Sequence, residues 1–239
     1  WSVFKNKEAE EMYRIISRDA FIFINNLNQG KESSYSRFMK NATFMIQNPR
    51  TLTKIVEGID GLDMNNRDTM GDVYEYILGK MAASGNNGQF RTPRHIIKMM
   101  VELMKPSLKD IVCDPAMGSA GFLVETAKYI QEHYKNELLE KEKIKHYKNG
   151  LLHGFDTDST MLRIGAMNLM LHGVDNPDIE YKDTLSTDNT DENKYTLCLA
   201  NPPFSGSLDN GAVSKSLLSI TKTKKTELLF MALFVRMLQ

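Results

Sequence analysis

The sequence predicts an α/β fold with a doubly wound, mostly parallel sheet, preceded by a helical domain. Residues 1 to about 85 read as helices, whereas the rest of the chain alternates short apolar runs with helical stretches. Strands that alternate with helices are typical of a parallel sheet with helices on its faces. Right-handed crossovers then give the doubly wound arrangement. We therefore expect a helical domain over residues 1–85 and an α/β domain over residues 86–239.

The clearest helix of the first domain starts near Asp68. Its apolar side chains recur at intervals of three and four residues, which places them on one helical face: Met70, Val73, Tyr74, Ile77, Leu78 and Met81. The glycine-containing polar run from Ser84 to Gly88 interrupts this pattern and marks the expected domain boundary.

The second domain opens with a helix that Pro93 starts and Pro106 ends. Short apolar runs predict four strands, over residues 111–113, 151–155, 178–182 and 195–200. Helices are predicted over residues 120–134, 159–172 and 226–238, and the last is apolar on nearly every side, so we expect it to be buried. Mixed charges indicate a solvated helix end and loop over residues 135–148, and small polar residues indicate a mobile loop over residues 205–226.

The charge balance bears on possible partners. Lysine and arginine total 30, as do aspartate and glutamate, whereas a free-standing DNA-binding protein is usually basic. Any nucleic-acid affinity should therefore be local or come from a partner.

Cys113 and Cys198 lie in apolar runs and look like buried strand residues, which favours a reducing, cytoplasmic setting. No run approaches the roughly 20 apolar residues of a membrane span, no signal peptide is visible, and we expect the chain to continue beyond Trp1 and Gln239.

A polar group or a tight loop follows each of the four predicted strands. Asp114 to Gly121 follow the first strand, Asp156 ends the second, Asp183 ends the third, and Asn201 to Phe204 follow the fourth. Ligands of doubly wound sheets bind beyond the carboxyl ends of the strands. These four features should therefore line one rim of the sheet.

The loop after the first strand contains Gly118 and Gly121, which permit a tight turn and a close approach of a ligand to the backbone. Backbone N–H groups at the start of the next helix favour an anionic group such as a carboxylate. The alternative is an ordinary strand-to-helix turn. The loop lacks the G-x-G-x-x-G spacing and the Lys-Ser/Thr of a P-loop, which disfavours dinucleotide and triphosphate ligands.

The two acids have alternatives as well. Asp156 can accept hydrogen bonds from ribose hydroxyls, or it can cap the next helix, although Asp158 and Ser159 are better placed for capping. Asp183 is either a ligand contact or a turn residue.

Asn201-Pro202-Pro203-Phe204 is the sharpest signal. Two prolines fix an extended backbone after the strand, which orients the Asn201 side chain and the Pro202 carbonyl. Because Pro203 has no N–H, nearby carbonyls remain available to a ligand amino group, and Phe204 offers a flat face for a stacked base. The alternative is a strand-ending turn with a core phenylalanine.

Together these residues resemble the amino-methyltransferases that use S-adenosylmethionine, and more narrowly the modification (M) subunit of type I restriction-modification systems. Gly88 to Arg94 is similar to that family's motif around Phe-Tyr-Thr-Pro. Asp114 to Leu123 resembles its Asp-Pro-Ala-Cys-Gly-Thr-Gly-Gly-Phe-Leu motif, and Asn201 to Phe204 its Asn-Pro-Pro-Tyr/Phe motif. The segments around Asp156, Asn168 and Asp183 follow in the family's order, and the first 85 residues are similar to its helical domain.

The resemblance implies a Rossmann-like S-adenosylmethionine-dependent methyltransferase fold and methyl transfer to N6 of adenine in DNA. The implied cofactor contacts are Gln89, Phe90, Arg91, Thr92, Pro93, Arg94, Asp114, Ala116, Gly118, Ser119, Ala120, Gly121, Phe122, Asp156 and Asp183. Among these, Asp114 lies near the methionine moiety, Asp156 holds the ribose and Asp183 contacts the adenine ring. The implied catalytic residues, which hold the target base, are Asn201, Pro202, Pro203 and Phe204. The implied partners are DNA with a flipped adenine, a specificity subunit and a restriction subunit.

Three residues depart from the family pattern: Arg91 replaces an aromatic residue, Met117 a cysteine or alanine, and Ala120 a glycine. The last two touch the ligand mainly through the backbone, so we expect binding to survive. One alternative to a DNA methyltransferase is a protein glutamine N-methyltransferase, because the glutamine side chain of such a substrate presents a similar amino group. The other is an inactive scaffold, against which the intact Asn201–Phe204 motif argues. The five histidines have no zinc spacing, so no metal is expected.

Overall fold

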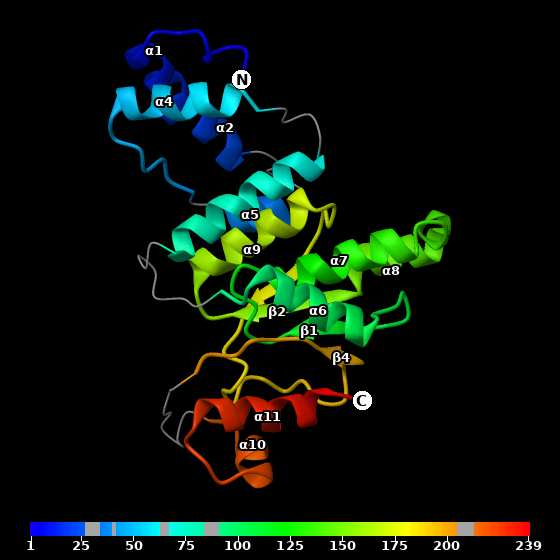
Figure 1. Ribbon diagram of the computed structural model, residues 1–239. Coiled ribbons are helices and arrows are strands. Elements are labelled where there is room, and N and C mark those ends of the chain that lie inside the picture. The colour runs from blue at the N-terminus through cyan, green and yellow to red at the C-terminus, as the bar shows by residue number, and fades with distance from the viewer. Residues whose placement is uncertain (27–33, 40–41, 63–66, 84–90, 205–212) are drawn as a thin grey trace. The chain divides into compact units, whose positions relative to one another are not determined.

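The computed structural model describes residues 1–26, 34–39, 42–62, 67–83, 91–204 and 213–239 (Figure 1). The chain divides into two compact units, Trp1–Val73 and Tyr74–Gln239. The domain boundary that the sequence predicts near residue 85 falls in residues 84–90, outside the described residues.

The first unit is built from helices. α1 (Ala9–Arg14) continues through a π-helical turn, η1 (Ile15–Ala20), into α2 (Phe21–Asn26), and α3 (Ser34–Met39) and α4 (Pro49–Asp60) follow. α4 starts where the sequence carries good start signals, because Asn48 Oδ1 accepts the Arg50 N–H at 2.9 Å and proline occupies the first helical position. A small apolar core joins α1, η1 and α4 through Met12, Ile16, Leu52 and Val56.

Two helices precede the sheet. α5 (Arg67–Ala83) confirms the helix that the sequence predicts from Asp68, although Ile77 on its predicted apolar face is 49% exposed. α6 (Arg94–Met104) begins after Pro93 and ends where Lys105 adopts a left-handed conformation, and it buries Ile97 and Val101.

The four predicted strands form one parallel sheet. They are β1 (Val112–Asp114), β2 (Leu152–Asp156), β3 (Asp178–Tyr181) and β4 (Leu197–Cys198), in the order β3-β2-β1-β4. In the register, Cys113 lies opposite His153 on one side and Cys198 on the other. Both cysteines are free and lie on strands, as the sequence predicts, but only Cys113 is buried and Cys198 is half-buried.

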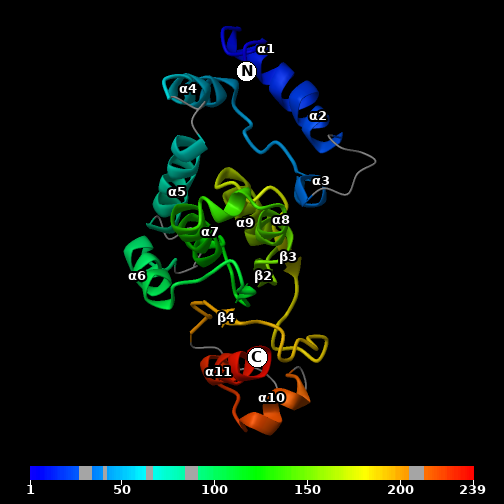
Figure 2. The same cartoon turned by 90° about the vertical axis from the view of Figure 1, so that its right-hand side faces the viewer.

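Helices cover both faces of the sheet, which confirms the doubly wound α/β prediction. α7 (Gly121–His133) and α9 (Ser159–Leu171) lie on one face, and α10 (Lys215–Ile220) and α11 (Thr226–Met237) lie on the other (Figures 1 and 2). Side chains alternate between the faces: Cys113 and Phe155 pack in the cluster with α10 and α11, while a Cβ on Gly154 would meet Leu123 of α7.

Three details differ from the sequence prediction. The charged stretch contains a further helix, α8 (Lys141–Asn149), which buries Tyr147. α10 lies inside the segment expected to be a loop. α11 is not buried all round, because Leu228, Met231 and Val235 are exposed at 46%, 60% and 68%. None of the helices in the described parts, α11 included, combines the length and apolarity needed to cross a bilayer.

Candidate active site at the carboxyl edge of the sheet

The predicted site features lie along one rim of the sheet. Since all strands are parallel, the ends of β3, β2, β1 and β4 meet at one edge in that order, which places the Asp183 turn, Asp156, the loop after β1 and Asn201 along it. β1 leads to α7 on one face, whereas β4 leads toward α10 and α11 on the other. This divergence is the topological switch point where doubly wound sheets bind ligands.

The loop after β1, residues 115–120, is tied to the end of β2 by two hydrogen bonds. The Met117 N–H donates to the Phe155 carbonyl at 3.0 Å, and the Gly118 N–H donates to Asp156 Oδ2 at 2.9 Å. Gly118 has φ of +52°, a conformation that glycine adopts without a Cβ penalty. The loop is therefore a fixed turn on the rim, and its backbone is open to a ligand at Gly118.

Ala120 is the second residue of this loop, after Gly118, that adopts a left-handed backbone conformation. It precedes α7 with φ of +63° and is fully buried. A left-handed alanine costs about 1–2 kcal/mol relative to glycine, so surrounding contacts must hold it. α9 approaches closely enough for this, because a Cβ built on Gly165 would lie 3.3 Å from the Ala120 Cβ and 3.3 Å from the Gly118 carbonyl oxygen.

Asp156 is half-buried at the end of β2 and is not the cap of α9. Asp158 takes the capping role, because its Oδ1 accepts the Thr160 N–H at 2.7 Å. The two oxygens of Asp156 each accept one backbone N–H, from Gly118 and from Asp158. An ionised carboxylate has about four acceptor positions, so Asp156 can still accept hydrogen bonds from a ligand hydroxyl.

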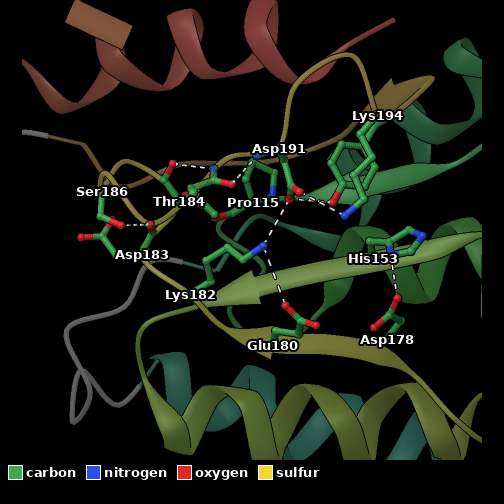
Figure 3. Close-up of polar contacts among 12 residues, drawn as sticks. Pro115, His153, Asp178, Glu180, Lys182, Asp183, Thr184, Ser186, Asp191 and Lys194 are labelled. Atoms are coloured by element: carbon green, nitrogen blue, oxygen red, sulfur yellow. Dashed lines mark hydrogen bonds and ion pairs between the residues drawn. The ribbon is translucent and has the colours of Figure 1, made fainter. Parts of the chain in front are cut away.

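The segment after β3 is joined to the loop after β1 by a buried hydrogen bond (Figure 3). Asp183 is exposed and its Oδ1 accepts the Leu185 N–H at 3.0 Å, so it is a turn residue. Its carboxylate retains acceptor positions for a ligand. The next residue, Thr184, donates from Oγ1 to the Pro115 carbonyl at 3.1 Å. The Asp183 turn and the loop after β1 therefore hold each other in place.

A charged cluster supports the chain between β3 and β4 (Figure 3). Asp191 pairs with Lys182 at 3.2 Å and Lys194 at 3.1 Å and accepts the Tyr195 hydroxyl at 3.0 Å. Burial opposes ionisation of Asp191, but these hydrogen bonds and the Lys182 charge lower its pKa below the usual value. Lys182 Nζ also lies 4.2 Å from the centre of the Phe155 ring.

Asp114 is the most deeply buried acid of the rim, with 1% of its surface exposed. Burial raises its pKa to about 8, and the nearby Asp156 charge adds to the shift, although the Ala116 N–H donates to Oδ1 at 3.1 Å and opposes it. Asp114 is therefore largely protonated near neutral pH unless a cationic group lies beside it.

The Asn201–Phe204 segment follows β4 directly, beside the end of β1. The last pairing before it is the Leu199 N–H with the Cys113 carbonyl at 3.0 Å. Asn201 and Pro202 are half-buried, Pro203 is exposed and Phe204 is 64% exposed. Phe204 is thus not a core residue, which removes the alternative in which it only fills the interior.

The comparisons with known proteins agree with this architecture. The model of the N-6 DNA methylase family matches residues 65–239. The chain belongs to this family.

Several of the proteins that this chain resembles are methylase subunits of type I restriction enzymes. The StySJI subunit from Salmonella typhimurium is 31% identical over 229 residues, which cover 88% of this chain and 43% of that protein. The EcoKI subunit from Escherichia coli K12 is 28% identical over 240 residues, which cover 94% of this chain and 44% of that protein. The chain thus spans less than half of these relatives.

Solved structures show the same fold. A modification subunit assigned to a type I restriction enzyme of Vibrio vulnificus YJ016 aligns with a TM-score of 0.72 and 27% identity, over 90% of this chain and 46% of that one. A type I modification methyltransferase subunit from Streptococcus thermophilus aligns with a TM-score of 0.68 and 19% identity, over 97% and 50% of the two chains.

The family's segment before α6 is only partly described. Gln89 and Phe90 lie outside the described residues. Arg91 is half-buried and pairs with Glu75 of α5 at 3.1 Å between Nη2 and Oε2. Thr92 is half-buried, and Pro93 and Arg94 are exposed at the start of α6.

Sequence reasoning assigned no supporting role to three residues that hold parts of the candidate site in place: Glu75, Asn168 and Thr184. Thr184 holds Pro115, and Asn168 donates to the carbonyl of Ser119. Their residue types carry no signal for these roles, because each acts on a partner far away in the sequence. In the described parts of the chain, no group of three or more His, Cys, Asp or Glu side chains is arranged to hold a metal ion.

Proposed function

We propose that this chain is the catalytic part of a DNA methyltransferase that transfers a methyl group from S-adenosylmethionine to N6 of adenine, within the modification subunit of a type I restriction-modification complex. One observation carries the proposal: Asn201–Phe204 and the loop after β1 flank the same switch point of the sheet. A donor held by that loop and an amino group held by Asn201 would therefore be neighbours.

The rim residues fit S-adenosylmethionine. Asp156 keeps acceptor positions for ribose hydroxyls, and Gly118 leaves the backbone open where a Cβ would meet no described atom within 4 Å. The backbone N–H groups at the start of α7 suit the carboxylate of the methionine part. Asp183, which is exposed beside the loop, would contact the adenine ring of the cofactor. When bound, the cofactor supplies an electrophilic methyl group on a sulfonium.

Asn201 and Pro202 act on the target nitrogen. The N6 lone pair of adenine is delocalised into the ring, so the nitrogen is a weak nucleophile. Asn201 Oδ1 and the Pro202 carbonyl each accept one N6 hydrogen, which favours a tetrahedral nitrogen with an available lone pair. The same fixed dipoles stabilise the positive charge that grows on N6 during attack. Holding N6 in line with the donor contributes much of the rate.

Phe204 receives the base. A base inside a duplex cannot reach this rim, so the adenine must leave the stack, which costs a few kcal/mol. The exposed Phe204 ring offers a stacking surface that offsets part of this cost. The neutral chain fits delegation of sequence recognition to a specificity subunit, with a restriction subunit joining for cleavage.

Asn201→Ala tests this proposal in the full-length chain combined with its specificity subunit. Transfer of labelled methyl groups to DNA should fall by more than a hundredfold, while calorimetric titration should show S-adenosylmethionine binding within a few-fold of the unaltered chain. Asn176→Ala is the matched control, because Asn176 is exposed just before β3, at the opposite edge of the sheet. Full methylation by Asn201→Ala, or labelling of protein rather than DNA by the unaltered chain, would contradict the proposal.

A further inference from the structure

A buried amide connects the loop after β1 to two helices. Asn168 of α9 has no exposed surface, and its Nδ2 donates to the Ser119 carbonyl at 2.9 Å and to Glu75 Oε1 at 2.6 Å. Both acceptors are oxygen atoms, so the opposite orientation of the amide would set Oδ1 against two oxygens. The contacts therefore require a side chain that donates two hydrogen bonds at this position.

Glu75 connects this amide to the segment before α6. Its other oxygen, Oε2, accepts from Arg91 Nη2 at 3.1 Å, and the Glu75 and Arg91 side chains are only 12% and 24% exposed. One carboxylate of α5 is therefore shared between Arg91 and Asn168. Hydrogen bonds to an ionised group in such a site are about twice as strong as neutral ones.

The two ends of this network are both proposed cofactor contacts. Ser119 lies between Gly118 and the left-handed Ala120, where α9 packs against the loop through Gly165. Arg91 lies three residues before the start of α6. A change in the network would move the loop carbonyl and this segment without removing any atom that touches the cofactor.

We propose that Glu75 and Asn168 are positioning residues for S-adenosylmethionine, which set the Ser119 carbonyl and Arg91 in their binding arrangement. The inference rests on the proposed function, because it names what the network serves. Arg91 takes part through its charge: an aromatic side chain at this position could not pair with Glu75.

Two nearly isosteric variants of the full-length chain test this. Glu75→Gln removes the charge that Arg91 faces, and Asn168→Asp replaces the donating nitrogen with an oxygen. We expect the dissociation constant for S-adenosylmethionine, measured by calorimetry, to rise about tenfold or more in each variant. With the cofactor saturating, kcat should stay within about threefold of the unaltered chain. The double variant should bind about as weakly as the weaker single variant, because both changes break one network.

Glu137→Gln is the matched control. Like Glu75→Gln it removes the carboxylate of an ion pair, here Lys143–Glu137 at 2.8 Å, but this pair lies beyond the end of α7 that is remote from the loop. Asn168→Ala serves if Asn168→Asp fails to fold, since it deletes the donor without adding a charge.

Unchanged cofactor affinity in folded Glu75→Gln and Asn168 variants overturns the inference. So does a loss of affinity that only tracks a lower melting temperature and a matching fall in kcat, since that marks a purely structural role. If the unaltered chain does not bind S-adenosylmethionine, the proposed function fails and the inference fails with it. If the unaltered chain binds and the variants bind equally well, only the inference fails.

Discussion

Gly154, at the centre of β2, is a position where a single methyl group should disturb both the fold and the site. A Cβ built there would lie 2.6 Å from Met117 Sδ, 2.9 Å from Leu123 Cδ1 and 3.0 Å from Ile179 Cγ2. Real Cβ atoms do not approach so closely, so at least Met117 and Leu123 must move. Met117 directly precedes Gly118 in the loop after β1, so we expect its shift to disturb the Gly118 N–H that donates to Asp156.

Overpacking a filled core by a methylene-sized group costs about 1–3 kcal/mol. For a protein of 150–250 residues, about 1 kcal/mol shifts the melting temperature by about 2–4 °C, so Gly154→Ala should lower it by roughly 2–12 °C. Thermal unfolding followed by circular dichroism measures this shift. Titration with S-adenosylmethionine should also show weaker binding than in the unaltered chain.

Gly79→Ala in α5 is the matched control. A Cβ there meets no atom of the described residues within 4 Å. Because glycine inside a helix is less favourable than alanine by about 0.8–1 kcal/mol, this variant should melt slightly higher. The two glycine-to-alanine changes should therefore have opposite signs. A Gly154→Ala chain that melts at or above the unaltered temperature would refute the packing argument.

Two further predictions concern Asp114 and Phe204. Because burial raises the Asp114 pKa from 3.8 to about 8, the folded chain keeps a proton that the unfolded chain releases near pH 4. The Asp114 contribution to stability is therefore complete below about pH 4 and is lost as the pH rises toward 8. In Asp114→Asn the free energy of unfolding, measured with urea from pH 4 to pH 8, should decline less with pH than in the unaltered chain. An unchanged pH profile would contradict the raised pKa of Asp114. Phe204→Ala should weaken capture of target DNA roughly 5- to 150-fold, since stacking contributes about 1–3 kcal/mol per base. Its melting temperature should not change because the ring is exposed, and unaltered DNA binding and transfer would count against the stacking role.

The short apolar runs in the sequence, each followed by a polar residue, were sufficient to predict which residues lie at the carboxyl edge of the sheet. Each strand is a short apolar run that ends at a polar residue, and parallel pairing alone then brings Asp156, Asp183 and Asn201 to one edge. The cap of α9 was also readable, since Asp158 stands directly before the helix and Asp156 does not.

Contacts between distant residues were not readable from the sequence. Thr184 and Pro115 are 69 residues apart, and Asn168 lies 49 residues from Ser119 and 93 from Glu75. No periodicity or spacing rule relates such pairs, because they depend on how α5 and α9 pack near the loop.

The sequence predictions for α8 and for the burial of α11 were wrong because both features also depend on contacts with the rest of the fold. In α8 the many charges obscured a single buried position, Tyr147, whose hydroxyl accepts from Gln131 at 2.6 Å. In α11 the opposite occurred, because apolar residues surround the helix but only part of its surface meets the sheet. The composition of a helix therefore does not predict how much of its surface is buried against other elements.

The attachment of the loop after β1 to β2, α9 and Thr184 has a thermodynamic consequence for ligand capture. Ordering a flexible backbone costs about 1–2 kcal/mol for each residue, and a loop that closed only around its ligand would bear this loss on every binding event. Here the bonds from Met117 and Gly118 to the end of β2 fix the backbone beforehand. The loop therefore loses its conformational entropy when the protein folds and not when a ligand binds. Contacts with the ligand then contribute more of their free energy to the binding affinity.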